Sequence, residues 1–271
     1  MNKLPKISIL TPSYNQGKYI EENILSVLNQ NYDNFEHIII DGGSTDNTIE
    51  VLKKYPHLKW VSEPDEGQSD ALNKGLKIAS GEIIGWMNSD DFYENKVFKY
   101  IVDSFVNEKV NWVIGLIYYS YENIDKKIES KFIEVNYNNL IKYPDIVTQQ
   151  GAFYRKKFLE KVNGWDKRKY MVMDYDLWIK LVKISEPYMI NKVIGNFYHH
   201  SSQKTNISNY IRQIKEINSI YRIEKVPIYY RKVYLKRIKS YIKKVIKLLL
   251  IRLKLLDKKY SYTPLRVKRI L

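Results

Sequence analysis

Short apolar runs alternate along the first part of the chain with longer segments in which apolar residues recur at helical spacing. The short runs predict strands at residues 6–10, 35–40, 58–61 and 82–87. The periodic segments predict amphipathic helices between them, at residues 19–30, 47–55 and 70–79. Strands that alternate with helices in this way indicate βαβ units and a parallel sheet. The pattern therefore predicts an α/β protein whose ligands bind at the carboxyl ends of the strands.

The rest of the chain shows the same kind of pattern with longer interruptions. Further strands are predicted at residues 112–117, 147–154 and 188–197, and further helices at residues 96–106, 155–162 and 173–184. Residues 118–146 are rich in tyrosine, asparagine and lysine and are predicted to be irregular. This insertion is expected either to bind a variable substrate or to be a plain surface excursion.

Polar residues follow each of the first four predicted strands. They occupy residues 12–15, 41–43, 63–65 and 88–91. Because the carboxyl ends of parallel strands meet at one edge of a sheet, we expect these residues to form a single site.

The last of these segments carries two adjacent carboxylates, Asp90 and Asp91, directly after a buried strand. Two carboxylates in such a position are costly unless a positive charge lies beside them. Carboxylate and amide oxygens suit hard divalent cations such as Mg²⁺ or Mn²⁺. The alternative is a solvated turn in which an aspartate caps the next helix.

The net charge of +15 and the 24 tyrosines are compatible with a nucleic-acid-binding protein, but the charge is unevenly distributed. Residues 204–271 hold 20 lysines and arginines and 3 acidic residues, whereas residues 1–203 hold 25 basic and 27 acidic residues. The strand-end motifs lie in the slightly acidic part. We therefore expect no nucleic-acid partner, and a boundary near residue 204.

The basic end of the chain has the pattern of an amphipathic helix over residues 229–256, with lysines mostly off its apolar stripe. A helix of this kind is expected to lie on an anionic membrane surface. The alternatives are docking on the protein's own core or on a second subunit, which would make a homo-oligomer.

The chain contains no cysteine, which excludes disulfides, thiolate zinc sites and thiol nucleophiles. The apolar run near the N-terminus is too short for a signal peptide, and no segment has the length of a membrane span. We expect a cytoplasmic protein that is peripheral on the inner face of the plasma membrane.

Several motifs, taken together, resemble family 2 glycosyltransferases with the GT-A fold. They are TPSYNQGKYIEENILSVLNQNY at 11–32, EHIIIDGGSTDNT at 36–48, EPDEGQSDALNKG at 63–75 and NSDD at 88–91, followed by GWD at 164–166 and MDYDLW at 173–178. The resemblance covers about residues 6–203. It implies a GT-A domain with a mixed central sheet at 1–203 and a basic helical tail at 204–271. Within the domain, residues 1–117 would be the nucleotide-sugar half and residues 118–203 the acceptor half.

The resemblance implies transfer of a sugar, with inversion at its anomeric carbon, from a nucleotide-diphosphate donor that is usually UDP-linked. The acceptor would be a hydroxyl of an oligosaccharide or of a glycan on a polyprenyl diphosphate, in the synthesis of a surface polysaccharide. The donor is expected to contact Pro12, Ser13, Tyr14, Asp41, Asp70, Asn73, Asn88 and Ser89.

The resemblance also assigns chemical roles in the site. Asp174 matches the general base, with Asp176 as the alternate. A divalent cation, Mn²⁺ or Mg²⁺, is expected to be held by Asp90, with Asp91 and His200 in support, although His199 is adjacent to His200. The acceptor is expected to contact Trp165, Asp166 and Gln150, and Trp165 would stack on a sugar ring.

Two positions depart from the family pattern. Asn88 stands where the family usually has an aspartate, and Met173 stands where it commonly has a glutamate. Asn88 brings no charge, so we expect weaker metal affinity. These departures are also the only support for an alternative, a catalytically silent protein that binds nucleotide sugars or scaffolds a polysaccharide assembly complex.

Overall fold

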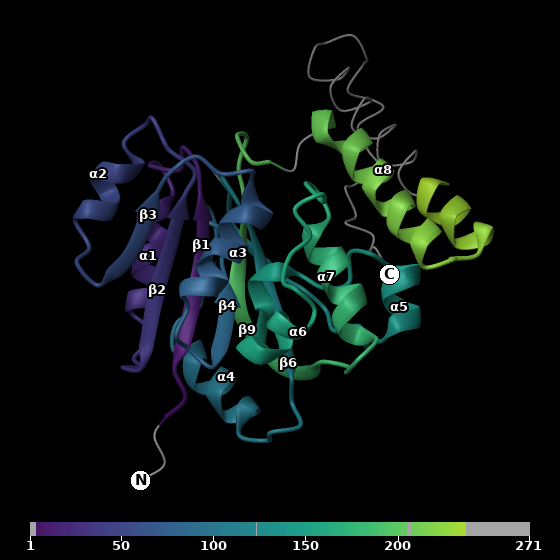
Figure 1. The fold of residues 1–271 in the computed structure, drawn as a ribbon, viewed down its shortest axis with the longest axis horizontal. Coiled ribbons are helices and arrows are strands. Elements are labelled where there is room, and N and C mark those ends of the chain that lie inside the picture. Colours follow the sequence, from purple (N-terminus) through teal and green to yellow (C-terminus); the bar gives the residue numbers. More distant parts are fainter. Residues whose placement is uncertain (1–3, 123, 205–206, 237–271) are drawn as a thin grey trace.

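A nine-stranded mixed sheet forms the centre of the part of the chain that the structure describes, residues 4–122, 124–204 and 207–236 of this computed structural model (Figure 1). The strand order is β3-β2-β1-β4-β8-β6-β9-β5, and β7 pairs with β6. The first four strands are parallel, whereas β8 is antiparallel to both β4 and β6. The strands are β1 (Ile7–Ser13), β2 (Phe35–Asp41), β3 (Leu58–Ser62), β4 (Ile83–Trp86), β5 (Phe92–Tyr93), β6 (Trp112–Tyr121), β7 (Ile124–Glu129), β8 (Ala152–Arg155) and β9 (Tyr188–His199).

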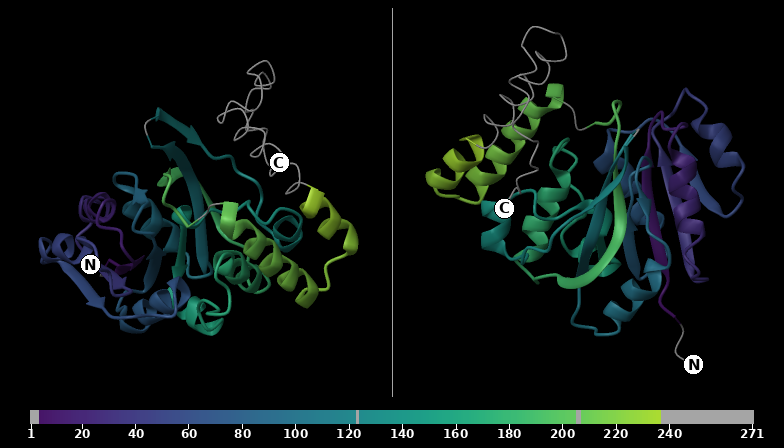
Figure 2. Two further views of the ribbon diagram at one scale, coloured as in Figure 1. Left: turned by 90° about the horizontal axis from the view of Figure 1, so that it is seen from above. Right: turned by 180° about the vertical axis from the view of Figure 1, so that it is seen from behind.

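Helices connect the strands and cover both faces of the sheet (Figures 1 and 2). Side chains alternate along β1, so Leu10 packs with Leu72 of α3 on one face while Ile9 packs with Val27 of α1 on the other. The helices are α1 (Ile20–Leu28), α2 (Thr48–Lys53), α3 (Gln68–Ile78), α4 (Val97–Phe105), α5 (Tyr137–Lys142), α6 (Lys156–Lys161), α7 (Met173–Val182) and α8 (Ile207–Ile223), with a 3₁₀ turn, η1 (Gln149–Gly151). The predicted α/β class and mixed sheet are confirmed.

The register of the parallel strands brings the polar strand ends together. Ser13 pairs with Asp41 at the end of the β1–β2 ladder, and Leu10 pairs with Trp86 at the end of β4. Residues 88–91 therefore follow β4 at the level where β1 ends. The convergence that the sequence pattern predicted is confirmed for these strands.

Two segments differ from the predicted elements. Residues 118–146 are not irregular throughout, because β6 continues to Tyr121, turns back as β7 and is followed by α5. Figure 2 shows the β6–β7 hairpin extending beyond the neighbouring strands. The strand predicted at residues 147–154 begins only at Ala152, since the residues before it form η1. Apolar content did not distinguish this short buried turn from a strand.

Helix α8 follows the predicted boundary near residue 204 and packs on the main core. Ile220 and Tyr221 are buried in the same cluster as α7 and β6 residues, and Tyr221 donates a hydrogen bond to the Ile141 carbonyl at 2.8 Å. Tyr234, beyond the helix, is only 7% exposed. Packing therefore continues past the residue at which the charge of the sequence changes.

The amphipathic helix predicted at residues 229–256 lies largely outside the described residues. Residues 228–236 are helical, and residues 237–256 are not described. Among the helices that the structure describes, none is long and apolar enough to cross a membrane.

Replacement of Ile220 by alanine should destabilise the whole domain, because the side chain is 2% exposed in the main core. We expect a loss of about 2–4 kcal/mol in the free energy of unfolding, measured by urea denaturation. Ile211→Ala on the same helix is the matched control, since Ile211 is 63% exposed, and should cost less than about 0.5 kcal/mol. Equal, small effects of the two substitutions would contradict the packing of α8 on the core.

Candidate active site

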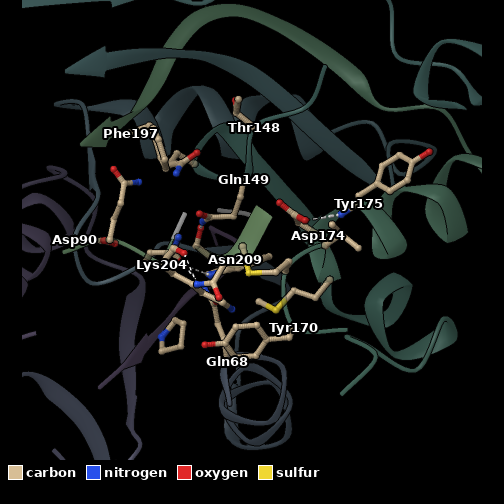
Figure 3. Close-up of a pocket in the computed structure, with 18 of the residues that line it drawn as sticks. Gln68, Asp90, Thr148, Gln149, Tyr170, Asp174, Tyr175, Phe197, Lys204 and Asn209 are labelled. Atoms are coloured by element: carbon tan, nitrogen blue, oxygen red, sulfur yellow. Dashed lines mark hydrogen bonds between the residues drawn. The ribbon is translucent and has the colours of Figure 1, made fainter. Parts of the chain in front are cut away.

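A pocket of about 760 Å³ opens at the carboxyl ends of β1 and β4 and extends toward α7 and α8 (Figure 3). Pro12, Ser13 and Tyr14 line it from β1 and the following loop, and Asn88, Ser89 and Asp90 line it from the segment after β4. The Ser89 hydroxyl lies 3.2 Å from the Pro12 carbonyl, to which it donates a hydrogen bond. The structure thus brings these six predicted residues together.

Asp90 and His200 form a pair beside the pocket. His200 Nε2 lies 3.0 Å from Asp90 Oδ2, and the other ring nitrogen, Nδ1, lies 2.9 Å from the Ser202 hydroxyl. His199 is directed elsewhere, because its ring stacks on Tyr121 with centroids 4.7 Å apart. Geometry therefore separates two histidines that the sequence leaves equivalent, and His200 is the one beside the carboxylate.

The Asp90–His200 pair has the chemistry of a partial cation site. The described residues contain no group of three or more histidine, cysteine, aspartate or glutamate side chains arranged to hold a metal ion. Mg²⁺ in nucleotide enzymes is commonly held by one or two carboxylates together with substrate phosphates. One carboxylate and one imidazole fit that kind of site, in which the substrate completes the coordination.

Asp91 does not line the pocket, in contrast to its predicted role as a supporting metal ligand. Its side chain is buried and accepts hydrogen bonds from the Tyr198 backbone N–H at 2.9 Å and from Gln150 Nε2 at 2.7 Å. Asn88 Nδ2 is a third donor, at 3.3 Å. Burial and the nearby charge of Asp90 raise the pKa of Asp91 well above its usual range, against the three donors, which lower it. Asp91 therefore joins β4 to β9 and η1.

The same contact changes the roles of Gln150 and Asn88. Gln150 lines the pocket, but its amide nitrogen donates to Asp91, so only part of this side chain is available to an acceptor. Asn88 Oδ1 accepts from Gln68 Nε2 at 2.6 Å and from Trp86 Nε1 at 2.9 Å. An aspartate at position 88 would lack the N–H that Asn88 offers to Asp91. The departure from the acidic pattern at this position has a local structural reason.

Asp174 lies in the first turn of α7 and lines the pocket, and Figure 3 shows it across the pocket from Asp90. Glu216 of α8 holds this turn in place by accepting hydrogen bonds from the backbone N–H groups of Tyr170, Met171 and Val172. Burial raises the pKa of Asp174 to about 6, although its own helix N–H groups and the charge of Lys204 lower it. A carboxylate with such a pKa is suited to take a proton near neutral pH.

Asp176 and Met173, the other two α7 residues discussed from the sequence, contact neighbouring side chains of the protein. Asp176, the alternate base, is paired with Lys180 at 2.6 Å and does not line the pocket. Met173 packs against α3, and its sulfur accepts a hydrogen bond from the Ser69 hydroxyl at 3.0 Å. A glutamate at position 173 would place a charge in this buried contact.

Three predicted donor residues lie outside the pocket. Asp41 is fully buried, and its carboxylate accepts hydrogen bonds from the backbone N–H groups of Gly43 and Ser44 in its own loop and from the Ser62 hydroxyl at the end of β3, at 2.7 Å. Asp70 is paired with Lys167 at 2.5 Å. The Asn73 side chain bonds both backbone groups of Trp165. Each of these polar groups is engaged with the fold, and their contacts with the donor stay a prediction.

The predicted acceptor residues Trp165 and Asp166 are also placed differently. Trp165 is 1% exposed and packs edge-on against Trp86 with ring centroids 5.7 Å apart. Its ring is therefore not accessible to a sugar in this structure. The Asp166 carboxylate is paired with Arg168 at 2.8 Å and does not line the pocket.

The structure adds pocket residues that the motifs did not identify. An aromatic wall comes from β6 and β9, where Tyr119 and Phe197 meet with ring centroids 6.2 Å apart beside His199. The sequence signal for this wall is weak, since it requires knowing that β6 and β9 are neighbours. Other unpredicted lining residues include Gln68, Thr148, Tyr170, Lys204 and Asn209.

Comparison with known proteins gives a family and a fold. The model of Glycosyl transferase family 2 matches residues 8–163, more than half of the chain. The chondroitin synthase of Escherichia coli is 28% identical over 209 residues, which are 74% of this chain and 30% of that protein. The chain thus spans less than a third of that relative's length.

Two solved structures share the fold. S. aureus TarS 1–349 in complex with UDP-GlcNAc has a TM-score of 0.61 and 21% identity, covering 78% of this chain and 65% of that chain. The mannosyltransferase PcManGT of Pyrobaculum calidifontis, in complex with GDP-Man and Mn²⁺, has a TM-score of 0.57 and 18% identity, covering 79% of this chain and 62% of that chain. These likenesses, with the mixed sheet, confirm the predicted GT-A fold.

Asparagine substitutions should separate the roles of the two adjacent aspartates. In Asp91→Asn, either orientation of the amide turns its NH₂ toward at least one N–H donor, so we expect a loss of about 1–3 kcal/mol in stability. Asp90→Asn removes only a part-exposed contact with His200 and should cost less than about 1 kcal/mol. Urea unfolding at pH 7 measures both. A larger loss of stability for Asp90→Asn than for Asp91→Asn would contradict these assignments.

Proposed function

The chain belongs to glycosyl transferase family 2, and we propose that it transfers a sugar from a UDP-linked donor to a hydroxyl of a growing surface polysaccharide. The observation that carries the proposal is the arrangement of one pocket with the Asp90–His200 pair on the donor side and Asp174 across from it. A donor sugar bound near the Asp90–His200 pair and an acceptor hydroxyl bound near Asp174 would meet between them.

The donor assignment draws on the pocket and on the fold neighbours. Pro12, Ser13 and Tyr14 offer a surface at the end of β1, where ligands of open α/β sheets bind, and Tyr14 is 59% exposed there. TarS is in complex with UDP-GlcNAc and PcManGT with GDP-Man, so both neighbours carry nucleotide sugars. We take UDP as the nucleotide by analogy with TarS.

The residues that would hold a divalent cation are Asp90 and His200. The Mn²⁺ in the PcManGT complex supports a cation in this fold. When bound, such a cation would neutralise part of the charge on the departing diphosphate. Asp91 is left out of this set because its oxygens are engaged with Tyr198, Gln150 and Asn88.

Asp174 is the proposed general base. Its carboxylate accepts the proton of the acceptor hydroxyl while that oxygen forms a bond to the anomeric carbon of the donor sugar. The bond from the same carbon to the diphosphate breaks on the opposite face, the bonding electrons leave with the diphosphate, and the configuration inverts. Glu216 supports this step by fixing the turn that carries Asp174.

The acceptor is proposed to be a glycan, and the aromatic wall of Tyr119, Phe197 and His199 replaces Trp165 as its stacking surface. The similarity to chondroitin synthase supports a polysaccharide acceptor. A polyprenyl-diphosphate-linked glycan would fit a protein held at the inner face of the plasma membrane. Membrane attachment through residues 229–256 remains part of this proposal.

The two departures from the family pattern no longer favour a catalytically silent protein. Asn88 donates to Asp91, and Met173 packs on Ser69, so each has a structural reason. A nucleic-acid partner has no support from the pocket, whose lining includes four acidic residues.

Asp174→Asn should abolish transfer while leaving UDP binding within about threefold of the wild type. Donor turnover is followed by release of nucleoside diphosphate, and binding by calorimetry. Asp176→Asn is the matched control, because Asp176 is paired with Lys180 away from the pocket. Transfer that persists in Asp174→Asn at a wild-type rate would exclude Asp174 as the base.

The rate of transfer should depend on pH through the same group. Since burial raises the pKa of Asp174 to about 6, the base is protonated below that value and the rate should fall about tenfold per pH unit there. The rate should level off above pH 7 until other groups titrate. A rate that stays constant from pH 7 down to pH 5 would contradict the assignment.

Removal of residues 237–271 should release the protein from anionic membranes without unfolding it. The cut leaves the buried Tyr234 and the whole of α8 in place. Binding is measured by co-sedimentation with vesicles containing phosphatidylglycerol, and vesicles of phosphatidylcholine alone are the control. Unchanged sedimentation of the shortened protein would show that this segment is not the anchor.

A further inference from the structure

Lys204 is a cation in the pocket that forms no ion pair with an acidic residue in the described part of the chain. Among the residues that line the pocket in the described part of the chain, it is the only lysine or arginine. Its Nζ donates to Gln68 Oε1 at 2.9 Å and lies 4.0 Å from the centre of the Tyr170 ring. No carboxylate of the described residues forms an ion pair with it, and in Figure 3 it lies between Asp90 and Asp174.

A largely buried ammonium group with only a neutral partner is unusual, because buried charges in proteins are normally paired. Burial lowers the pKa of Lys204 to about 8, and the more distant charges of Asp174 and Glu216 offset this only in part, while Arg212 adds to it. The cation–π contact with Tyr170 compensates for some of the lost hydration. A bound anion in the pocket would supply the remaining counter-charge.

The hydrogen bond from Lys204 to Gln68 places the ammonium group near the expected donor site. Gln68 accepts from Lys204 through its oxygen and donates to Asn88 Oδ1 through its nitrogen, at 2.6 Å. This relay connects the ammonium group to the segment after β4, two residues before Asp90. A nucleotide-sugar donor carries its negative charges on the diphosphate, which is the group expected beside Asp90.

We propose that Lys204 binds the β-phosphate of the donor, as a cationic contact separate from the Asp90–His200 pair. The inference rests on the proposed function. When the bond between the sugar and the β-phosphate breaks, negative charge grows on the departing oxygen, and an ammonium group at that position stabilises it. Asn88 brings no negative charge to hold a metal ion, so metal affinity is expected to be weak. Lys204 would supply positive charge beside the diphosphate that does not depend on a metal.

Calorimetric titration with UDP and UMP in EDTA tests this contact without a contribution from metal. The wild type should bind UDP more tightly than UMP, and Lys204→Met should weaken UDP binding about 10- to 100-fold, as expected for a lost charge-assisted hydrogen bond. Its affinity for UMP should change less than about threefold. Lys204→Arg should keep most of the affinity for UDP, because it keeps the charge.

Lys77→Met is the matched control for the change in net charge, since Lys77 is exposed on the same helix as Gln68 and away from the pocket. It should bind UDP as the wild type does. Thermal unfolding of each variant confirms that it is folded, and Lys204→Gln serves as a second neutral variant that can still bond Gln68.

The outcomes are distinguishable. Equal affinity of Lys204→Met and the wild type for UDP would overturn the inference and leave the proposed function standing. The same result with a raised KM for an anionic acceptor would assign Lys204 to the acceptor instead, which also overturns it. A wild-type protein that binds neither UDP, GDP nor dTDP would refute both the inference and the proposed function.

Discussion

The hydrogen bonds accepted by the buried Asp91 carboxylate hold the walls of the pocket together. Because the Tyr198 N–H donates to it, the end of β9 is fixed beside the end of β4, and His200 follows only two residues later. His200 is thereby placed 3.0 Å from Asp90. The same carboxylate accepts from Gln150 of η1 and from Asn88 of its own segment. Asp91 thus holds the walls of the pocket together, whereas the adjacent Asp90 lines the pocket.

Helix α8 plays the corresponding part around Asp174. Glu216 binds three consecutive backbone N–H groups ahead of α7, so the turn that carries Asp174 is held from a helix that begins after residue 204. Lys204 lies just before that helix and places a positive charge in a pocket otherwise lined by acidic and neutral groups. The segment after β4 and the segment ahead of α8 therefore contribute opposite charges, from Asp90 and Lys204, to one cavity.

Sequence patterns predicted most elements of the sheet and the location of the site, because strand periodicity and polar strand ends are local signals. They were less informative about which polar residues face the ligand. Asp41, Asp70 and Asn73 match motifs, yet their side chains brace loops, and Trp165 completes the core. A motif shows which residue type is needed at a position. Whether that side chain points into the pocket or into the fold depends on partners far along the chain.

The aromatic wall and Lys204 depend on such distant partners, so no local sequence pattern places them in the pocket. The aromatic wall exists because β6 and β9 are neighbours in the sheet, and Lys204 was counted with the basic tail because charge alone defined the boundary.

A crystal structure of the full chain with UDP and Mn²⁺ would test the proposed donor site most directly. We expect uracil near Pro12 and Tyr14, the metal on Asp90 and His200, and the diphosphate within reach of Lys204, with open space toward Asp174 for sugar and acceptor. UDP bound outside this pocket, or a diphosphate directed away from Asp90, would contradict this expectation.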